Sequence, residues 1–343
     1  MATLHPIREA HQEHSVPWFW PLAAAIEFGG EGMRLFQRNP EFLVQAHVIN
    51  APPLPDWATP NRIDLALDTL HLRDFSRHGS ATISAPVLID PPYAGHSSSL
   101  ADYAKGQSLV ETLRAAGHDR VFVMDWKSAT PDMKNYEIDK YLADINLVVD
   151  ELRTPVRLVG LCQGGWMSAM YASRFPGKVR SLVLAGAPID TDAGSGPMHA
   201  SGPTVLDQIY RPLSAHRGQK LHRSQRALRA WFENALDLPG RYYLQAVEEL
   251  FKANRFAKGE FIGLGRKLSL KDIRIPLFLL AGASDDITTS EQVLEAARLV
   301  GTPQSAIVTR MAPGGHIGLF MGSKTLAETW PEIGHWMKSH EHH

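Results

Sequence analysis

The chain has 343 residues, of which 44% are hydrophobic, enough to bury one large core or two smaller ones. Its 35 basic and 36 acidic side chains nearly cancel, which excludes the strongly basic surface expected of a nucleic-acid-binding protein. A single cysteine cannot form a disulfide within the chain, and no apolar run reaches the roughly 18 residues of a membrane span. We therefore expect a cytoplasmic protein without a transmembrane segment.

Residues 1–80 contain few strand signals. An amphipathic helical stretch is predicted over 16–36 and a proline-rich linker over 50–60, so we expect residues 1–80 to form an N-terminal helical segment and linker. The aromatic residues of 16–22 either adhere to an apolar surface or pack against an edge of the main domain.

From residue 85 onwards, short apolar runs alternate with segments of helical periodicity. We predict strands over 85–90, 120–126, 156–160 and 179–188, and helices over 107–117, 136–152 and 166–175. The alternation resumes with a strand from 275, a helix over 290–300, a strand over 305–311 and a helix over 324–338. Near-continuous apolar strands between helices are typical of a mainly parallel sheet covered by helices on both faces.

The intervening residues 189–270 are polar, rich in arginine and helical in pattern. We predict that they form a helical cap insertion over the strand ends of one α/β domain, built from residues 81–188 and 271–340. The basic stretch 211–231 either attracts phosphate groups, such as those of coenzyme A, or forms a solvated helix face.

The single cysteine lies at a junction between a predicted strand and a predicted helix. The segment Gly160-Leu161-Cys162-Gln163-Gly164 has the layout of a nucleophile elbow, with cysteine in the position of serine. Glycines are needed there because side chains beside the tight turn would collide with the neighbouring strand and helix. The helix N-terminus also favours a thiolate. The alternative, that Cys162 is a small buried hydrophobic residue, leaves Gly160 and Gly164 unexplained.

A thiol nucleophile needs a base, and the base needs an acid that orients it. Among the 16 histidines, His316 follows the strand 305–311 directly and is the predicted base; its alternative role is to cap a loop. Asp285 stands three residues after Gly282, beyond the preceding strand, and is the predicted acid. Asp286 remains the alternative to Asp285.

The oxyanion hole is expected to combine two backbone N–H groups. One belongs to Gln163 and the other to the loop after the first strand, where Tyr93 or Ala94 is the expected donor. His96 in the same loop either approaches the site or is solvated. No spaced metal-ligand cluster and no glycine-rich phosphate loop stand out, so we predict neither a metal nor a bound cofactor.

These motifs resemble two related families. The box Gly-Leu-Cys-Gln-Gly-Gly, followed by "WMSAMYASRFPGKVRSLVLAGAPID", resembles the polyhydroxyalkanoate synthases, whose nucleophile is a cysteine. The stretches "PPYAGHSSSL", "YYLQAVEELFKANRFAKGEF" and "GGHIGLFMGS" resemble the intracellular polyhydroxybutyrate (PHB) depolymerases. Depolymerases usually carry Cys-Gln-Pro, whereas this chain has Cys-Gln-Gly, as synthases do. Synthases have an Asn-Pro-Pro after the catalytic histidine, and this chain lacks it. Both families imply a Cys–Asp–His triad on an α/β-hydrolase fold.

The resemblance implies an acyl-transferring enzyme. Because the cap and the histidine loop shape the substrate pocket, we expect a depolymerase that cleaves 3-hydroxyacyl esters by hydrolysis or by coenzyme A thiolysis, through an acyl-cysteine. The alternative is a synthase that polymerises 3-hydroxyacyl-CoA. Further alternatives are an esterase or thioesterase for another acyl substrate and a catalytically silent granule-binding protein. The expected partners are a polyester or acyl-thioester substrate, with coenzyme A as co-substrate, the polyester granule surface and a second copy of the chain.

Overall fold

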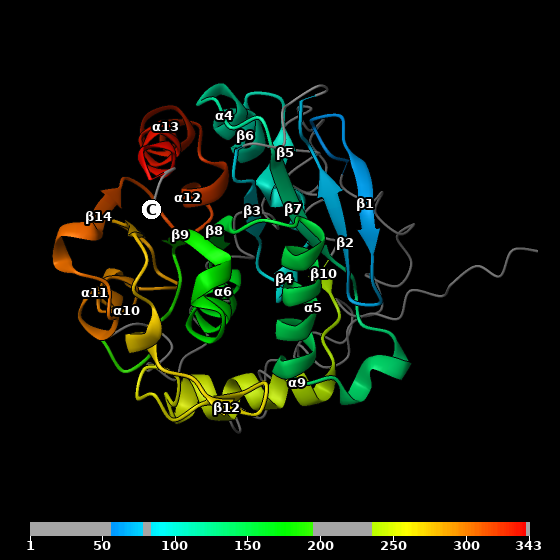
Figure 1. Ribbon diagram of the computed structural model, residues 1–343, viewed down its shortest axis with the longest axis vertical. Helices are drawn as coiled ribbons and strands as arrows, with labels where there is room; N and C mark the ends of the chain where they lie inside the picture. The colour runs from blue at the N-terminus through cyan, green and yellow to red at the C-terminus, as the bar shows by residue number, and fades with distance from the viewer. Residues whose placement is uncertain (1–55, 78–83, 195–234, 341–343) are drawn as a thin grey trace, which may run out of the picture. The chain divides into compact units, whose positions relative to one another are not determined.

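The structure is a computed structural model that describes residues 56–77, 84–194 and 235–340 (Figure 1). Three sequence-based predictions lie outside the described residues: the helical stretch 16–36 with its aromatic residues 16–22, and the basic stretch 211–231.

Among the described residues, eight strands form one sheet in the order β1-β2-β7-β3-β8-β9-β13-β14. The strands are β1 (Arg62–Ala66), β2 (Leu70–Asp74), β3 (Val87–Asp90), β7 (Val121–Trp126), β8 (Val156–Leu161), β9 (Val179–Ala185), β13 (Leu277–Gly282) and β14 (Ile307–Ala312). Neighbours from β7 to β14 pair in parallel, whereas β1, β2 and β7 pair antiparallel. The predicted mainly parallel sheet is confirmed.

The first two strands lie ahead of the predicted start of the main domain at residue 81, and that boundary is wrong. Residues 70–74 pair along β7 and alternate between buried and half-buried, while β1 is mostly exposed at the sheet edge. Such strands bury one face or neither, so they lack the continuous apolar run by which the central strands were recognised. Residues 62–74 therefore belong to the sheet and not to a linker.

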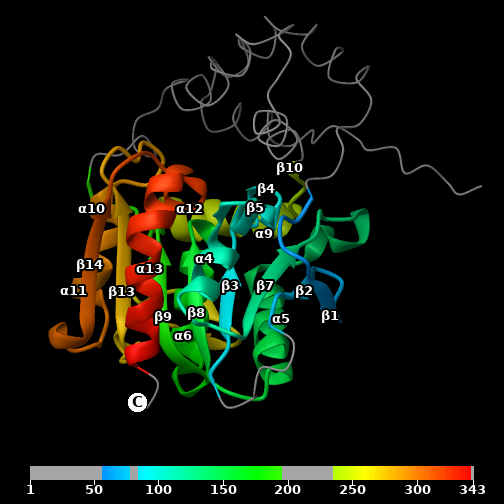
Figure 2. The same cartoon turned by 90° about the horizontal axis from the view of Figure 1, so that it is seen from above.

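Helices cover both faces of the sheet (Figures 1 and 2). They are α4 (Leu109–Ala115), α5 (Ile138–Glu151), α6 (Gln163–Arg174), α9 (Gly240–Gln245), α10 (Ser290–Leu294), α11 (Ala296–Leu299), α12 (Gly318–Met321) and α13 (Ser323–Ser339). The predicted helix over 290–300 is divided at Glu295, whose angles (φ −60°, ψ −23°) tighten the turn locally. The short helix α12 was not predicted.

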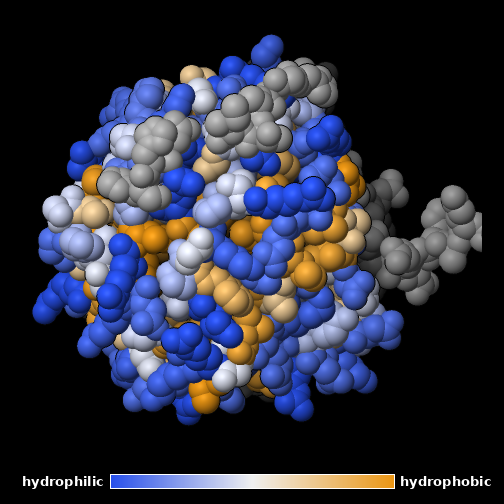
Figure 3. All heavy atoms as spheres, in the orientation of Figure 1, coloured by the Kyte–Doolittle hydropathy of each residue, from blue (hydrophilic) through white to orange (hydrophobic). Residues whose placement is uncertain are grey.

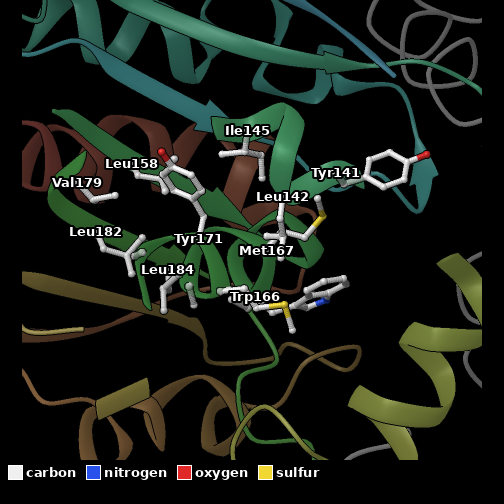
Figure 4. Close-up of a cluster of buried hydrophobic side chains, with 14 of the residues drawn as sticks. Tyr141, Leu142, Ile145, Leu158, Trp166, Met167, Tyr171, Val179, Leu182 and Leu184 are labelled. Atoms are coloured by element: carbon white, nitrogen blue, oxygen red, sulfur yellow. The ribbon is translucent and has the colours of Figure 1, made fainter. Parts of the chain in front are cut away.

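Two apolar clusters fill the space between the sheet and these helices. Side chains of α5 and α6 form one cluster with one face of the sheet (Figure 4), and side chains of α4, α12 and α13 form the other. In β3, Leu88 belongs to the first cluster, whereas Val87 and Ile89 belong to the second. The central strands are thus buried on both faces, which explains their mainly apolar sequences.

The predicted cap, residues 189–270, is described in part. Within 235–270, α9 continues into a π-helical segment, η4 (Ala246–Lys252), and β10 (Ala235–Leu236) pairs with β4 (Gly95–His96). The remaining short elements are β5 (Asp102–Ala104) with β6 (Gln107–Ser108), β11 (Ile262–Gly263) with β12 (Arg266–Lys267), and the 3₁₀ turns η1 (Ser98–Ala101), η2 (Pro131–Asn135), η3 (Pro176–Lys178), η5 (Leu270–Asp272) and η6 (Gln304–Ala306).

The surface is mixed in character. The face drawn in Figure 3 is mainly hydrophilic, with apolar side chains showing between the polar ones. Every helix within the three described ranges is too short or too polar to span a bilayer.

Candidate active site

Cys162 lies in the sharp turn between β8 and α6. Its backbone angles (φ 51°, ψ −118°) are unfavourable for a residue with a side chain, so neighbouring contacts must hold the turn in place. The Cys162 N–H donates to the Ala185 carbonyl at 2.8 Å, and the Gly165 N–H donates to the Cys162 carbonyl at 2.9 Å. The structure therefore places Cys162 on a strand–turn–helix junction, tied to β9 and to the first turn of α6.

The glycines around this turn have no room for side chains. A Cβ on Gly160 would lie 2.5 Å from the Gly165 Cα, and one on Gly164 would lie 2.0 Å from the Asp90 carbonyl oxygen. A Cβ on Gly165 would lie 2.3 Å from the Ala187 Cβ. The glycines thus allow α6 to start close against β3 and against the segment that follows β9.

His316 and Asp285 come together at the same edge of the sheet. The His316 Nδ1 lies 2.7 Å from the Asp285 Oδ2, with the two side chains 5% and 0% exposed. The other oxygen, Oδ1, accepts the N–H groups of Ile287 at 3.0 Å and Thr288 at 2.9 Å, which fixes the carboxylate. Of the two candidate acids, Asp285 contacts His316, whereas Asp286 is exposed.

The electrostatics of the site favour a protonated imidazole. Burial disfavours the imidazolium, yet the pKa of His316 is raised to about 10, because the electrostatic interaction with Cys162 and the hydrogen bonds to Asp285 and Cys162 outweigh burial. His316 thus bridges the half-buried Cys162 and Asp285. A cysteine beside an imidazole that a carboxylate orients is an arrangement suited to nucleophilic attack on an acyl group.

This pKa predicts how activity depends on pH. Because His316 keeps its proton up to a pH of about 10, kcat/KM for acyl transfer should decline on the alkaline side near that value. Asp285→Asn removes one cause of the raised pKa, so the alkaline decline should move to lower pH, with a loss of rate of about tenfold to a hundredfold. The matched control is Asp286→Asn at the exposed neighbour. A decline at the same pH in wild type and Asp285→Asn would contradict the assignment.

The predicted oxyanion donors lie together, with one unforeseen contact. Gln163 is the first residue of α6, where a backbone N–H has no partner within the helix. The Ala94 N–H, however, donates to the Gln163 side-chain oxygen Oε1. Tyr93 is fully buried, and its hydroxyl donates to the Asp237 carbonyl at 3.3 Å. The Ala94 amide can therefore serve an oxyanion only after the Gln163 side chain has rotated away.

Asp90, at the end of β3, is a residue near the site that the sequence motifs do not predict. Its carboxyl group is fully buried and accepts hydrogen bonds from the Ser168 hydroxyl at 3.0 Å and the Trp126 Nε1 at 3.2 Å. Burial raises the pKa of Asp90 well above its usual range, so the folded protein favours the neutral acid. The one sequence signal was an acidic residue directly after an apolar strand. Asp90 joins β3 and β7 to the helix that carries Cys162.

The raised pKa of Asp90 predicts how the stability of the protein depends on pH. The unfolded chain releases the Asp90 proton near pH 3.8, whereas the folded protein holds it to higher pH, so burial of Asp90 costs stability increasingly as the pH rises above 3.8. Asp90→Asn should therefore become more stable than wild type with rising pH, measured by urea unfolding. Asp90→Ala should lose about 1–3 kcal/mol, because it leaves the buried Ser168 hydroxyl without its acceptor, whereas the Trp126 Nε1–H keeps the Pro91 carbonyl. Asp132→Asn, at an exposed site, is the control. If Asp132→Asn gained as much stability with rising pH as Asp90→Asn, the effect would not come from the buried carboxyl group.

The remaining predictions about the site concern His96 and metals. The His96 backbone pairs with Ala235 between β4 and β10, and its side chain is outside what the structure describes. In the described part of the chain, no group of three or more histidine, cysteine or acidic side chains is arranged to hold a metal ion.

Comparisons with known proteins agree with this geometry. A family model described as "alpha/beta hydrolase fold" matches residues 86–323. The chain is 25% identical over 335 residues to the poly(3-hydroxyalkanoate) polymerase subunit PhaC of Allochromatium vinosum, a match covering 85% of this chain and 92% of that relative. The PhaC subunit of Haloferax mediterranei is 24% identical over 321 residues, covering 81% of this chain and 63% of that relative.

Among solved structures, the monoacylglycerol lipase of Paleococcus ferrophilus aligns with a TM-score of 0.53 at 19% identity, covering 79% of this chain and 99% of the lipase. That likeness concerns the fold. The PhaC relatives confirm the resemblance to polyhydroxyalkanoate synthases and favour the synthase alternative over the expected depolymerase. The family match over residues 86–323, the sheet order and the elbow at Cys162 together make this chain a member of the α/β-hydrolase fold family.

Proposed function

We propose that this protein transfers 3-hydroxyacyl groups from a thioester to a hydroxyl acceptor, as a polyhydroxyalkanoate synthase does, through an acyl-cysteine at Cys162. The observation that carries the proposal is the cysteine elbow beside the His316–Asp285 pair. The similarity to two PhaC subunits supports the choice of substrate.

In the first step, the Cys162 thiolate attacks the carbonyl carbon of a 3-hydroxyacyl-CoA. The bond between that carbon and the coenzyme A sulfur then breaks, and the departing thiolate takes the proton of the His316 imidazolium. The Gln163 N–H stabilises the tetrahedral oxyanion, joined by the Ala94 N–H once the Gln163 side chain has rotated away. The products are free coenzyme A, an acyl-Cys162 thioester and neutral His316.

In the second step, His316 accepts the proton of a hydroxyl group as that oxygen attacks the acyl-Cys162 carbonyl. The Cys162 sulfur leaves as a thiolate, which restores the thiolate–imidazolium pair, and Asp285 keeps the imidazole in the required orientation throughout. A hydroxyl at the end of a polyester gives chain growth. Water as acceptor gives hydrolysis, and coenzyme A acting on a polyester gives thiolysis, so the triad alone is compatible with all three.

The test offers the purified protein both directions of reaction. With 3-hydroxybutyryl-CoA we expect free coenzyme A and polyester, both absent with Cys162→Ala. The relatives are named as subunits, so loading of Cys162 is measured as well, because one subunit alone can accept the acyl group without polymerising it. Release of 3-hydroxybutyrate or 3-hydroxybutyryl-CoA from amorphous polyester granules, without loading from the thioester, would instead establish a depolymerase.

Three parts of the proposal concern partners. Coenzyme A is the leaving group of the first step or the acceptor in thiolysis. A polyester granule is the surface on which the product accumulates. A second copy of the chain is the dimer partner. Granule binding is measured with the Cys162→Ala variant. If this variant binds granules although it has lost acyl transfer, attachment does not depend on catalysis. Binding without any activity in the wild type would favour a granule-binding protein.

A further inference from the structure

A small pocket lies beside the first turns of α6, with room for about one water-sized group. Its near wall is Trp166, with Pro188 and Ile189 from the segment that follows β9. Its far wall includes Leu250 and Phe251 of the π-helical segment η4. Segments of π-helix are rare and occur frequently at functional sites.

Two chain segments lead from the Cys162–His316 pair to this pocket. Trp166 lies in the first turn of α6, four residues after Cys162, which caps that helix. After β9, a Cβ on Gly186 would lie 3.3 Å from the His316 Cε1, and two residues later Pro188 lines the pocket. Two residues span at most about 7 Å, so Pro188 and the pocket lie near the His316 imidazole.

Trp166, which lines the pocket, carries an unpaired hydrogen-bond donor. The Trp166 Nε1–H is buried, in a residue 2% exposed, and has no hydrogen-bond partner among the described residues. Figure 4 shows its indole extending from α6 towards α9, where it stacks on Tyr242 with ring centres 6.3 Å apart. A buried donor without a partner is costly and rare, and an indole N–H can only donate.

The other polar groups at the pocket are already engaged. The Thr191 hydroxyl donates to the Leu250 carbonyl at 3.0 Å, and the Asn254 Nδ2 donates to the Asp190 Oδ1 at 2.6 Å. The remaining walls are apolar. The pocket therefore suits a small apolar group that carries one hydrogen-bond acceptor.

We propose that this pocket receives the C3 end of a short 3-hydroxyacyl group, with the Trp166 Nε1–H donating to the oxygen on C3. The inference rests on the proposed function and adds the residue that distinguishes hydroxyacyl from plain acyl substrates. The small size of the pocket limits the group beyond C3 to about a methyl.

The test compares loading of Cys162 by 3-hydroxybutyryl-CoA and by butyryl-CoA, which differ only in the C3 hydroxyl group. The wild type should prefer the hydroxylated thioester in kcat/KM by about tenfold or more, because butyryl-CoA leaves the indole N–H unpaired. Trp166→Phe keeps an aromatic ring and removes the donor, so this ratio should fall towards one. Without substrate, Trp166→Phe should unfold at the same or a higher temperature, since it removes an unpaired buried donor.

A second pair of variants tests the size of the pocket. Leu250→Ala enlarges it and should shift the preference from 3-hydroxybutyryl-CoA towards 3-hydroxyhexanoyl-CoA by about tenfold. Leu244→Ala, at a side chain that is 55% exposed, is the control and should leave this preference unchanged. Both readouts are ratios, so they do not depend on how much of a variant folds. Loading with an unchanged ratio in Trp166→Phe would overturn this inference alone, whereas no loading by either thioester would overturn the proposed function as well.

Discussion

Replacing Cys162 with alanine is expected to lower the rate of acyl transfer by about a thousandfold or more, while the protein stays folded. In the proposed mechanism, alanine removes the atom that attacks the acyl carbonyl, and the oxyanion donors alone would leave little activity. The fold should persist because the hydrogen bonds that hold the elbow run through the backbone of residue 162. Coenzyme A release measures the rate, and thermal unfolding checks the fold.

The serine variant is the matched control for this prediction. Cys162→Ser keeps a nucleophilic oxygen in nearly the same place, but a hydroxyl group is much harder to ionise than a thiol. We expect its rate to lie between those of wild type and Cys162→Ala. Acyl transfer by Cys162→Ala at the wild-type rate would show that the elbow does not carry the nucleophile.

Gly164→Ala is expected to have the largest effect on the fold around the site. The added Cβ would lie 2.0 Å from the Asp90 carbonyl oxygen and 2.8 Å from the Pro91 carbonyl oxygen, both of which are backbone atoms. Either α6 or the loop that carries Ala94 must move, which should cost about 3 kcal/mol or more and abolish acyl transfer. Denaturant unfolding measures the first effect and coenzyme A release the second.

Gly177→Ala provides the comparison for that substitution. Gly177 is exposed in the turn η3, and a Cβ there would meet no heavy atom within 4 Å. Its free energy of unfolding should stay within about 0.5 kcal/mol of wild type. If Gly164→Ala were as stable and as active as Gly177→Ala, the close approach of α6 to β3 would be contradicted.

The central strands could be predicted because both of their faces are buried. β7, β8 and β13 are nearly continuous apolar runs between helices, interrupted at Asp125 in β7 and Arg157 in β8. β1 and β2 were not predicted from the sequence. Nearly all residues of β1 are exposed, and every second residue of β2 is only half-buried, so neither strand forms a continuous apolar run. The division of the helix over 290–300 at Glu295 depends on local angles that periodicity does not encode.

The triad could be found because parallel strands bring their carboxyl ends to one edge of a sheet. Cys162, Asp285 and His316 each follow such a strand, so their order along the chain predicted their meeting in space. Contacts between side chains of distant elements could not be found in this way. The hydrogen bond from Ala94 to the Gln163 side chain and the unpaired indole of Trp166 arise from three-dimensional packing alone.

The direction of the reaction was the least accessible part of the prediction. Hydrolysis, thiolysis and polymerisation share the triad and differ in the acceptor that reaches the acyl-cysteine. The cap and the histidine loop indicate a depolymerase, whereas the Cys-Gln-Gly box indicates a synthase, which the PhaC relatives favour. Residues 195–234 of the predicted cap lie outside the described part of the chain.

The most direct test of the central claim is to find the acyl group on the enzyme. The wild-type protein is mixed with 3-hydroxybutyryl-CoA, quenched in acid within the first turnover and digested, and the peptide that contains Cys162 is analysed by mass spectrometry. We predict that this peptide gains the mass of one 3-hydroxybutyryl group, which hydroxylamine removes as expected for a thioester. Release of coenzyme A while Cys162 stays unmodified, or an acyl group found on another residue, would contradict the account.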